Sequence, residues 1–125
     1  MVLECAVRIS LYELLKGSRL NAEWLSKVIP SFRMLTRSLK MRPRQAIIWL
    51  VVYELGKDKP EGISLSDMAS FSDAPLSEVF GFAEEFRWLD RRGYLVEMGL
   101  HKLPLSQKRY RCENCIIESV FLINE

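Results

Sequence analysis

The amino-acid sequence predicts a mainly α-helical fold with a small antiparallel β-hairpin. Apolar residues recur mostly at the three- and four-residue steps of amphipathic helices. The hairpin is predicted from strand character in Tyr94–Val96 and in a second segment around Lys108–Cys112. The chain has 125 residues, of which 49% are hydrophobic, and this size and composition predict a single domain, residues 1–125, with its own core.

Three helices are expected in residues 1–42. The first helix has apolar residues on one face, namely Leu3, Val7, Leu11 and Leu14. Gly17 is a typical residue at a helix C-terminus, and Asn21 is suited to cap the start of the second helix. Pro30 interrupts that helix. The third helix is then expected to carry the apolar residues Phe32, Leu35 and Leu39.

The segment "PRQAIIWLVVYELG", residues 43–56, predicts a helix that is buried on most sides. Pro43 stands at its start and Gly56 at its end, and its length exceeds that of a typical buried strand. The following "ISLSDMASF" predicts a short extended piece and a short helix. Ser64 and Asp67 have the spacing of a capping box, with Asp in place of the usual Glu.

The longest predicted helix is "DAPLSEVFGFAEEFRWLDRRG", with Pro75 in its first turn and Gly93 at its end. At 100° per residue its apolar face contains Leu76, Val79, Phe80, Ala83, Phe86 and Leu89. Its outward face contains Ser77, Glu78, Gly81, Glu84, Glu85 and Trp88. A final helix is expected around the apolar residues Ile116, Ile117, Val120 and Phe121.

From residue 43 onward this order of elements resembles the winged helix-turn-helix fold. The resemblance rests on "AIIWLVVYEL", "ISLSDMASF", "PLSEVFGFAEEFRWLDRRGYLV" and "KRYRC". It implies that residues 43–112 form a winged-helix core, that residues 1–42 are an N-terminal helical extension, and that residues 113–125 form a C-terminal helix. In such folds the third helix commonly ends in a turn like "LDRRGYLV", which leads into the β-wing.

The flanks of this core are similar to the N-terminal winged-helix module of a class of bacterial AAA-type ATPases. The segments that carry this similarity are "MRPRQAIIWLVVYEL" and "YRCENCIIESVFLIN". The similarity implies that the chain serves a larger ATPase or is a stand-alone relative of that module. The chain has no Gly-x-x-x-x-Gly-Lys-Ser/Thr loop, so it is not expected to bind ATP in that way.

A basic stretch and the predicted wing are the candidate nucleic-acid contacts. Residues 1–50 carry nine basic and three acidic residues, a net of +6, whereas residues 51–125 carry nine and thirteen, a net of −4. The basic stretch contains Arg33, Arg37, Lys40, Arg42 and Arg44. The predicted wing adds His101, Lys102, Lys108, Arg109 and Arg111. The alternative is that these residues are simply solvated.

The outward face of the long helix argues against the reading of DNA bases. Winged-helix proteins that read DNA insert their third helix into the major groove. Here that face is expected to carry three carboxylates and no Lys or Arg, and carboxylates oppose binding to phosphate. A solvated acidic face is therefore preferred over a groove-reading one.

No catalytic, cofactor or metal site is expected. Cys112 and Cys115 form a lone C-x-x-C, and Cys5 with His101 would be needed to complete a zinc set. The alternative is two small, partly buried thiols. His101 is the only histidine in the sequence, and the adjacent Glu84 and Glu85 diverge on a helix. The start of the chain does not resemble a signal peptide and no apolar run reaches the length of a membrane span, so a cytoplasmic protein with reduced thiols is expected.

Two functions remain open at this point. The first is a non-catalytic regulatory module that binds double-stranded DNA through residues 33–44 and the wing, and that serves an ATPase domain. The second is a protein-interaction or dimerisation module that does not bind DNA. Amphipathic N-terminal helices that could pair in a homodimer favour the second.

Overall fold

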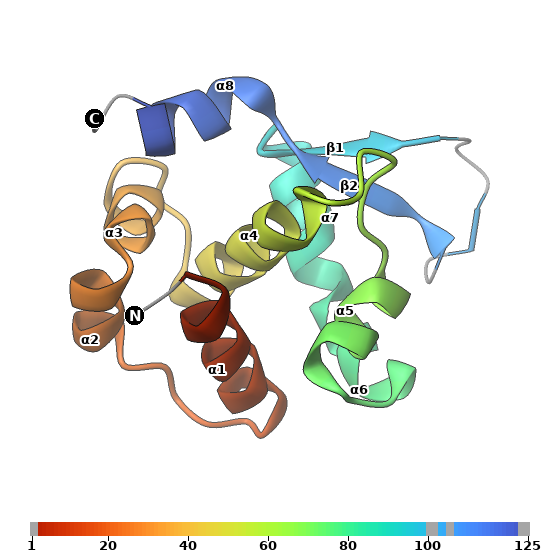
Figure 1. The fold of residues 1–125 in the computed structure, drawn as a ribbon, viewed down its shortest axis with the longest axis horizontal. Helices are drawn as coiled ribbons and strands as arrows, with labels where there is room; N and C mark the ends of the chain where they lie inside the picture. The colour runs from red at the N-terminus through yellow and green to blue at the C-terminus, as the bar shows by residue number, and fades with distance from the viewer. Residues whose placement is uncertain (1–2, 100–102, 105–106, 123–125) are drawn as a thin grey trace.

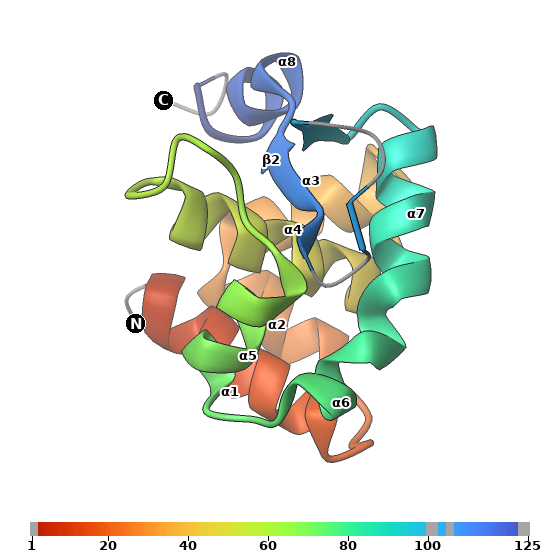
Figure 2. The ribbon, with the colours of Figure 1, turned by 90° about the vertical axis from the view of Figure 1, so that its right-hand side faces the viewer.

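A computed structural model of the chain describes residues 3–99, 103–104 and 107–122. Its helices are arranged around a central helix, α4 (Pro43–Gly56), and an antiparallel pair of strands lies beside that helix (Figures 1 and 2). The strands are β1 (Leu95–Met98) and β2 (Arg109–Cys112). The predicted fold class, mainly α with a small antiparallel β-element, is confirmed.

Helix α4 is central because it is apolar on nearly all sides. Each residue from Gln45 to Val52 is buried, as predicted from the sequence. A helix without a polar face is stable only where neighbours cover it all round. Its partners include α1 (Leu3–Leu15), α3 (Pro30–Arg37), α7 (Ala83–Arg91) and β2.

The ends of the N-terminal helices follow local chemistry. Gly17 ends α1 with a φ of 76°, a left-handed conformation that glycine adopts at little cost. Asn21 caps α2 (Ala22–Val28), because its Oδ1 accepts a hydrogen bond of 3.0 Å from the Trp24 amide. The prediction that the third helix extends to Leu39 is wrong. Helix α3 ends at Arg37, and Lys40 has a φ of 60°, which is incompatible with a continuing α-helix.

The predicted capping box opens α5 (Leu65–Ser72). The Ser64 amide donates to Asp67 Oδ2 at 2.9 Å, and the Asp67 amide donates to Ser64 Oγ at 3.3 Å. The preceding residue, Ile63, is the predicted extended piece. Its amide and carbonyl both bond to the main chain of Tyr110. Because those bonds occupy one edge of β2, that strand lies between Ile63 and β1.

The predicted long third helix is not a single α-helix. It consists of α6 (Leu76–Val79), a 3₁₀ segment (Phe80–Phe82) and α7. Gly81 is a weak helix former, and a 3₁₀ turn advances roughly 120° per residue instead of 100°. The buried residues of the segment are Val79, Phe82, Ala83, Phe86 and Leu89, and at 100° per residue Phe80 lies roughly 120° from the centre of their face. Phe82 is 2% exposed and Phe80 is 42% exposed, so the prediction that Phe80 belongs to the apolar face is wrong.

The turn after α7 is the one expected from "LDRRGYLV". Gly93 has a φ of 76°, its amide donates to the Asp90 carbonyl at 3.0 Å, and the Tyr94 amide donates to the Leu89 carbonyl at 2.9 Å. These two bonds define a Schellman motif, which directs the chain into β1. The predicted C-terminal helix corresponds to α8 (Asn114–Ile117), which continues into a π-helical turn, η3 (Glu118–Leu122).

Candidate nucleic-acid interface

Four of the predicted nucleic-acid residues form an exposed basic group on α3 and on the loop that follows it. They are Arg33, Arg37, Lys40 and Arg42. Within the described part of the chain, no carboxylate lies at ion-pair distance from any of the four. Their charge is therefore available to an anion from outside.

Arg33 and Arg37 form a ridge between two surface hollows. One hollow, of about 460 Å³, lies toward α2 and includes Ser26. The other, of about 440 Å³, includes Pro30 and Met34. Both guanidinium-bearing side chains are thus accessible from two sides, which suits contact with an extended polyanion.

Arg44, the fifth predicted residue of the basic stretch, has partners inside the protein. Its Nε lies 2.9 Å from Glu85 Oε1, and its Nη2 donates to the Gly81 carbonyl at 3.1 Å. Its guanidinium carbon also lies 4.8 Å from the centre of the Phe82 ring. Arg44 therefore joins the start of α4 to the third helical segment, and Glu85 compensates its charge.

The outward face of the third helical segment differs from the one predicted. The Glu85 side chain is only 16% exposed because it faces Arg44. Trp88 is half-buried, with its ring 5.9 Å from the Tyr94 ring. Arg87 is exposed and pairs with Glu84. The prediction of three outward carboxylates without a basic residue is therefore wrong, although Glu84 and Glu85 do diverge as expected.

A contact between distant segments extends the basic group. The Tyr94 hydroxyl donates to the Leu39 carbonyl at 3.1 Å and so holds the end of α7 against the loop that carries Lys40. The Arg92 guanidinium carbon lies 4.8 Å from the centre of the Trp88 ring, next to Tyr94. We define the basic surface as Arg33, Arg37, Lys40, Arg42 and Arg92. Sequence reasoning missed Arg92 because its link to Lys40 passes through a tertiary contact.

The basic residues predicted for the wing are mostly engaged elsewhere. Lys108 Nζ lies 3.3 Å from Glu97 Oε1, and Arg109 Nη1 lies 3.5 Å from Asp67 Oδ2. Arg111 donates to the Cys112 carbonyl and to Asn114 Oδ1. Lys102 and His101 lie outside the described residues. The charges of Lys108 and Arg109 are therefore compensated by carboxylates of the protein itself.

Carboxylates lie close to the buried Tyr110 side chain of β2. Burial raises the pKa of Tyr110 to about 12, and the nearby carboxylates Glu97 and Asp90 add to this effect. Burial also raises the pKa of Asp90, with a further contribution from Glu97 that Lys108 opposes. A phosphate approaching here would meet the carboxylates Glu97 and Asp90 together with Lys108, whose charge Glu97 compensates.

The C-x-x-C pair does not converge. Cys112 is buried and its thiol donates to the Trp49 carbonyl at 3.6 Å, whereas Cys115 is exposed. Burial raises the pKa of the Cys112 thiol well above its usual value, which disfavours the thiolate that zinc requires. Among residues 3–99, 103–104 and 107–122, no three His, Cys, Asp or Glu side chains gather as a metal site.

The function of the chain has to be inferred from the geometry of its surface, because comparisons with known proteins identify no relative. None of the helices in the described ranges combines the length and the apolar character needed to cross a bilayer. A scan against protein-family models and searches of curated proteins and of solved structures found no match to this chain.

Proposed function

We propose that the chain is a non-catalytic winged-helix regulatory module that binds the backbone of double-stranded DNA through the basic surface. The observation that carries this proposal is the Tyr94–Leu39 hydrogen bond, which unites the cations of the α3–α4 region with Arg92 at the end of α7. Cations without internal partners gain most from phosphate, because each neutralised phosphate releases counterions. A cytoplasmic setting and service to a larger AAA-type ATPase belong to the same proposal.

The winged-helix assignment is supported by the order and pairing of the elements. Helix α4 is followed by the Ile63 bridge, α5, the α6–α7 segment and the antiparallel strands. That order is the one implied by the resemblance seen in the sequence. The first turns of the α6–α7 segment carry Glu78 and no basic residue, so we assign the binding to backbone contact and not to the reading of bases.

The proposal is tested by salt-dependent binding to duplex DNA. The triple variant Arg37→Ala, Lys40→Ala, Arg42→Ala should bind more weakly to every sequence. Its plot of log affinity against log salt should be flatter by about 0.9 unit for each lost phosphate contact. The control variant Lys16→Ala, Arg19→Ala, Lys57→Ala removes the same charge outside the basic surface. Equal losses of affinity in the two variants would show that only net charge matters.

A second candidate, a homodimerisation module, is favoured by exposed apolar side chains at the other end of the N-terminal region. Ile9, Tyr12 and Trp24 are 45%, 50% and 37% exposed. Ile9 and Trp24 line a hollow of about 180 Å³ between α1 and α2. Sedimentation over a range of concentrations tests this candidate. A dimer that is lost in the Tyr12→Ser, Trp24→Ser variant, together with no measurable DNA binding by the parent protein, would establish it.

A further inference from the structure

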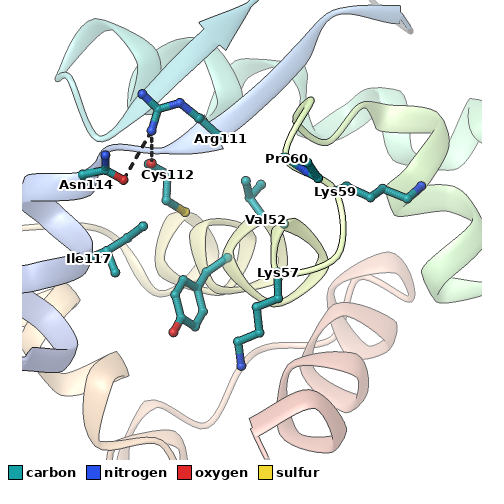
Figure 3. A pocket seen from close by; sticks show the side chains of 10 residues that line it. Val52, Lys57, Lys59, Pro60, Arg111, Cys112, Asn114 and Ile117 are labelled. Atoms are coloured by element: carbon teal, nitrogen blue, oxygen red, sulfur yellow. Dashed lines mark hydrogen bonds between the residues drawn. The ribbon is translucent and has the colours of Figure 1, made fainter.

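A hollow of about 220 Å³ lies at the C-terminal end of α4. Its walls come from the end of α4, residues 57–60, the end of β2 and α8 (Figure 3). Four residues of the basic surface, Arg33, Arg37, Lys40 and Arg42, lie on α3 and before the start of α4. A helix of this length spans roughly 20 Å, so the hollow is separate from these four residues.

The inner wall of the hollow is apolar and uncharged. Val52, Pro60 and Ile117 surround it (Figure 3), and the main-chain carbonyls of Leu55 and Gly56 already accept hydrogen bonds from the following loop. Cys112 also lines the hollow, and its thiol is neutral because burial disfavours the thiolate. This wall can therefore accept the hydrocarbon part of a ligand.

The rim of the hollow carries positive charge, and its described lining residues include no carboxylate. Lys57 and Lys59 extend away from its centre (Figure 3), and their Nζ atoms lie 3.1 Å from Glu54 Oε2 and 2.6 Å from Asp67 Oδ1. Arg111 differs from both lysines. Its Nη1 donates at 3.3 Å to the Cys112 carbonyl and at 3.4 Å to Asn114 Oδ1, and both acceptors are uncharged.

These two hydrogen bonds therefore orient the Arg111 side chain. They do not compensate its positive charge, because both acceptors are neutral. A guanidinium has five N–H donors, and both of these bonds come from Nη1. A carboxylate can occupy the remaining donors in the paired geometry that arginine favours. Asn114, at the start of α8, fixes the side chain at the rim and reduces the ordering cost of binding.

We propose that this hollow is a binding site for a small organic carboxylate, with the carboxylate on Arg111 and an apolar body of about six carbon atoms against Val52, Pro60 and Ile117. The site is independent of nucleic-acid binding through the basic surface. Such a ligand would bridge α4, β2 and α8, and it would make the chain responsive to a metabolite of this class.

Hexanoate and benzoate are suitable probes, and hexanol and sulfate are their matched controls. Titrations are followed by the chemical shifts of backbone amides in isotope-labelled protein. Hexanoate or benzoate should shift amides of residues 52–60 and 111–117 with a dissociation constant of about 1 mM or tighter. Hexanol lacks the charge and sulfate lacks the apolar body, so each should bind at least about tenfold more weakly.

Two variants separate the roles of charge and space. Arg111→Gln should weaken hexanoate binding about tenfold, whereas Arg37→Gln, which removes the same charge on α3, should leave it within about twofold. Gly56→Leu adds a side chain at the wall, where a Cβ meets no atom within 4 Å, and should abolish binding without unfolding the protein. Thermal melting checks that each variant is folded. Absence of shifts in these segments, equal binding of hexanol, or undiminished binding by folded Arg111→Gln or Gly56→Leu would overturn the proposal.

Discussion

Arg44 Nε lies 2.9 Å from Glu85 Oε1, and this contact joins the first turn of α4 to the third helical segment. The Glu85 side chain is mostly buried, and its Oε2 has no hydrogen-bond partner among the described residues. Its charge therefore depends on Arg44 for compensation. An acidic residue that would oppose DNA on an exposed helix face serves here to hold two helices together.

Replacing Arg44 by Met should lower the free energy of unfolding by about 1–3 kcal/mol. Methionine keeps much of the packing against Phe82 but leaves the Glu85 carboxylate without its cation. The double variant Arg44→Met, Glu85→Leu should recover part of this loss, because no unpaired charge remains. Urea denaturation measures all three proteins. Arg42→Met, at an exposed position, is the control and should change stability by less than about 0.5 kcal/mol.

The contrast between Arg42 and Arg44 illustrates what sequence reasoning could reach. The burial of α4, the Asn21 cap, the Ser64–Asp67 capping box and the turn at Gly93 were all predictable, because each depends on residues that are close together in the sequence. The Arg44–Glu85 and Tyr94–Leu39 contacts were not, since their partners meet only after α4 and α7 have packed.

The prediction of the outward face of the third helical segment was wrong for a different reason. The prediction counted Phe80 as part of the apolar face, whereas the buried face is centred on Val79, Phe82 and Phe86. Arg87 is therefore exposed, and Glu85 is turned toward Arg44, a partner that only the packing of the two helices supplies. Predictions of which residues face outward were therefore least reliable where they were needed to assess DNA binding.

Asp67 should make the stability of the protein sensitive to acid. Burial raises the pKa of Asp67, but hydrogen bonds from Lys59 and from the amide and hydroxyl of Ser64 outweigh this and lower it below the ordinary value. A group whose pKa is lower in the folded state contributes stability above its unfolded pKa of about 3.9. That contribution is lost as the pH falls through the folded pKa.

The Asp67→Asn variant should therefore lose stability at pH 7 and lose less than the parent between pH 5 and pH 2.5. Ser64→Ala, which removes the cap on the Asp67 amide, should cost about 1 kcal/mol at pH 7. Urea denaturation at several pH values measures both effects. Asp58→Asn removes a carboxylate at an exposed position and should leave the acid dependence close to that of the parent. Identical pH profiles for Asp67→Asn and the parent would contradict the assigned role.

The three cysteines should differ in reactivity. Cys5 and Cys115 are exposed, whereas Cys112 is buried with a raised pKa. A thiol reagent such as Ellman's reagent should modify two thiols per folded chain and the third only after unfolding. Because Cys112 does not converge with Cys115, the purified protein should carry no stoichiometric zinc by elemental analysis. One zinc per chain, or fast labelling of Cys112 in the folded state, would contradict this.

Gly93 should be the costlier of two glycines to replace. Its φ of 76° permits the Schellman turn between α7 and β1, and an added Cβ there meets no atom within 4 Å. Gly93→Ala should therefore lower the free energy of unfolding by about 1 kcal/mol, through the left-handed backbone alone and not through a clash. Gly56 is the matched control, since an added Cβ is equally free of contacts and its φ lies outside the left-handed range. Gly56→Ala should raise stability by about 0.5–1 kcal/mol, because alanine favours the helix.

The same pair of variants tests DNA binding. Because Tyr94 follows Gly93 and its hydroxyl donates to the Leu39 carbonyl, Gly93→Ala should also weaken DNA binding, whereas Gly56→Ala should not. Thermal melting and a DNA titration of the two variants measure this difference, and equal effects on DNA binding would show that the turn does not position the basic surface.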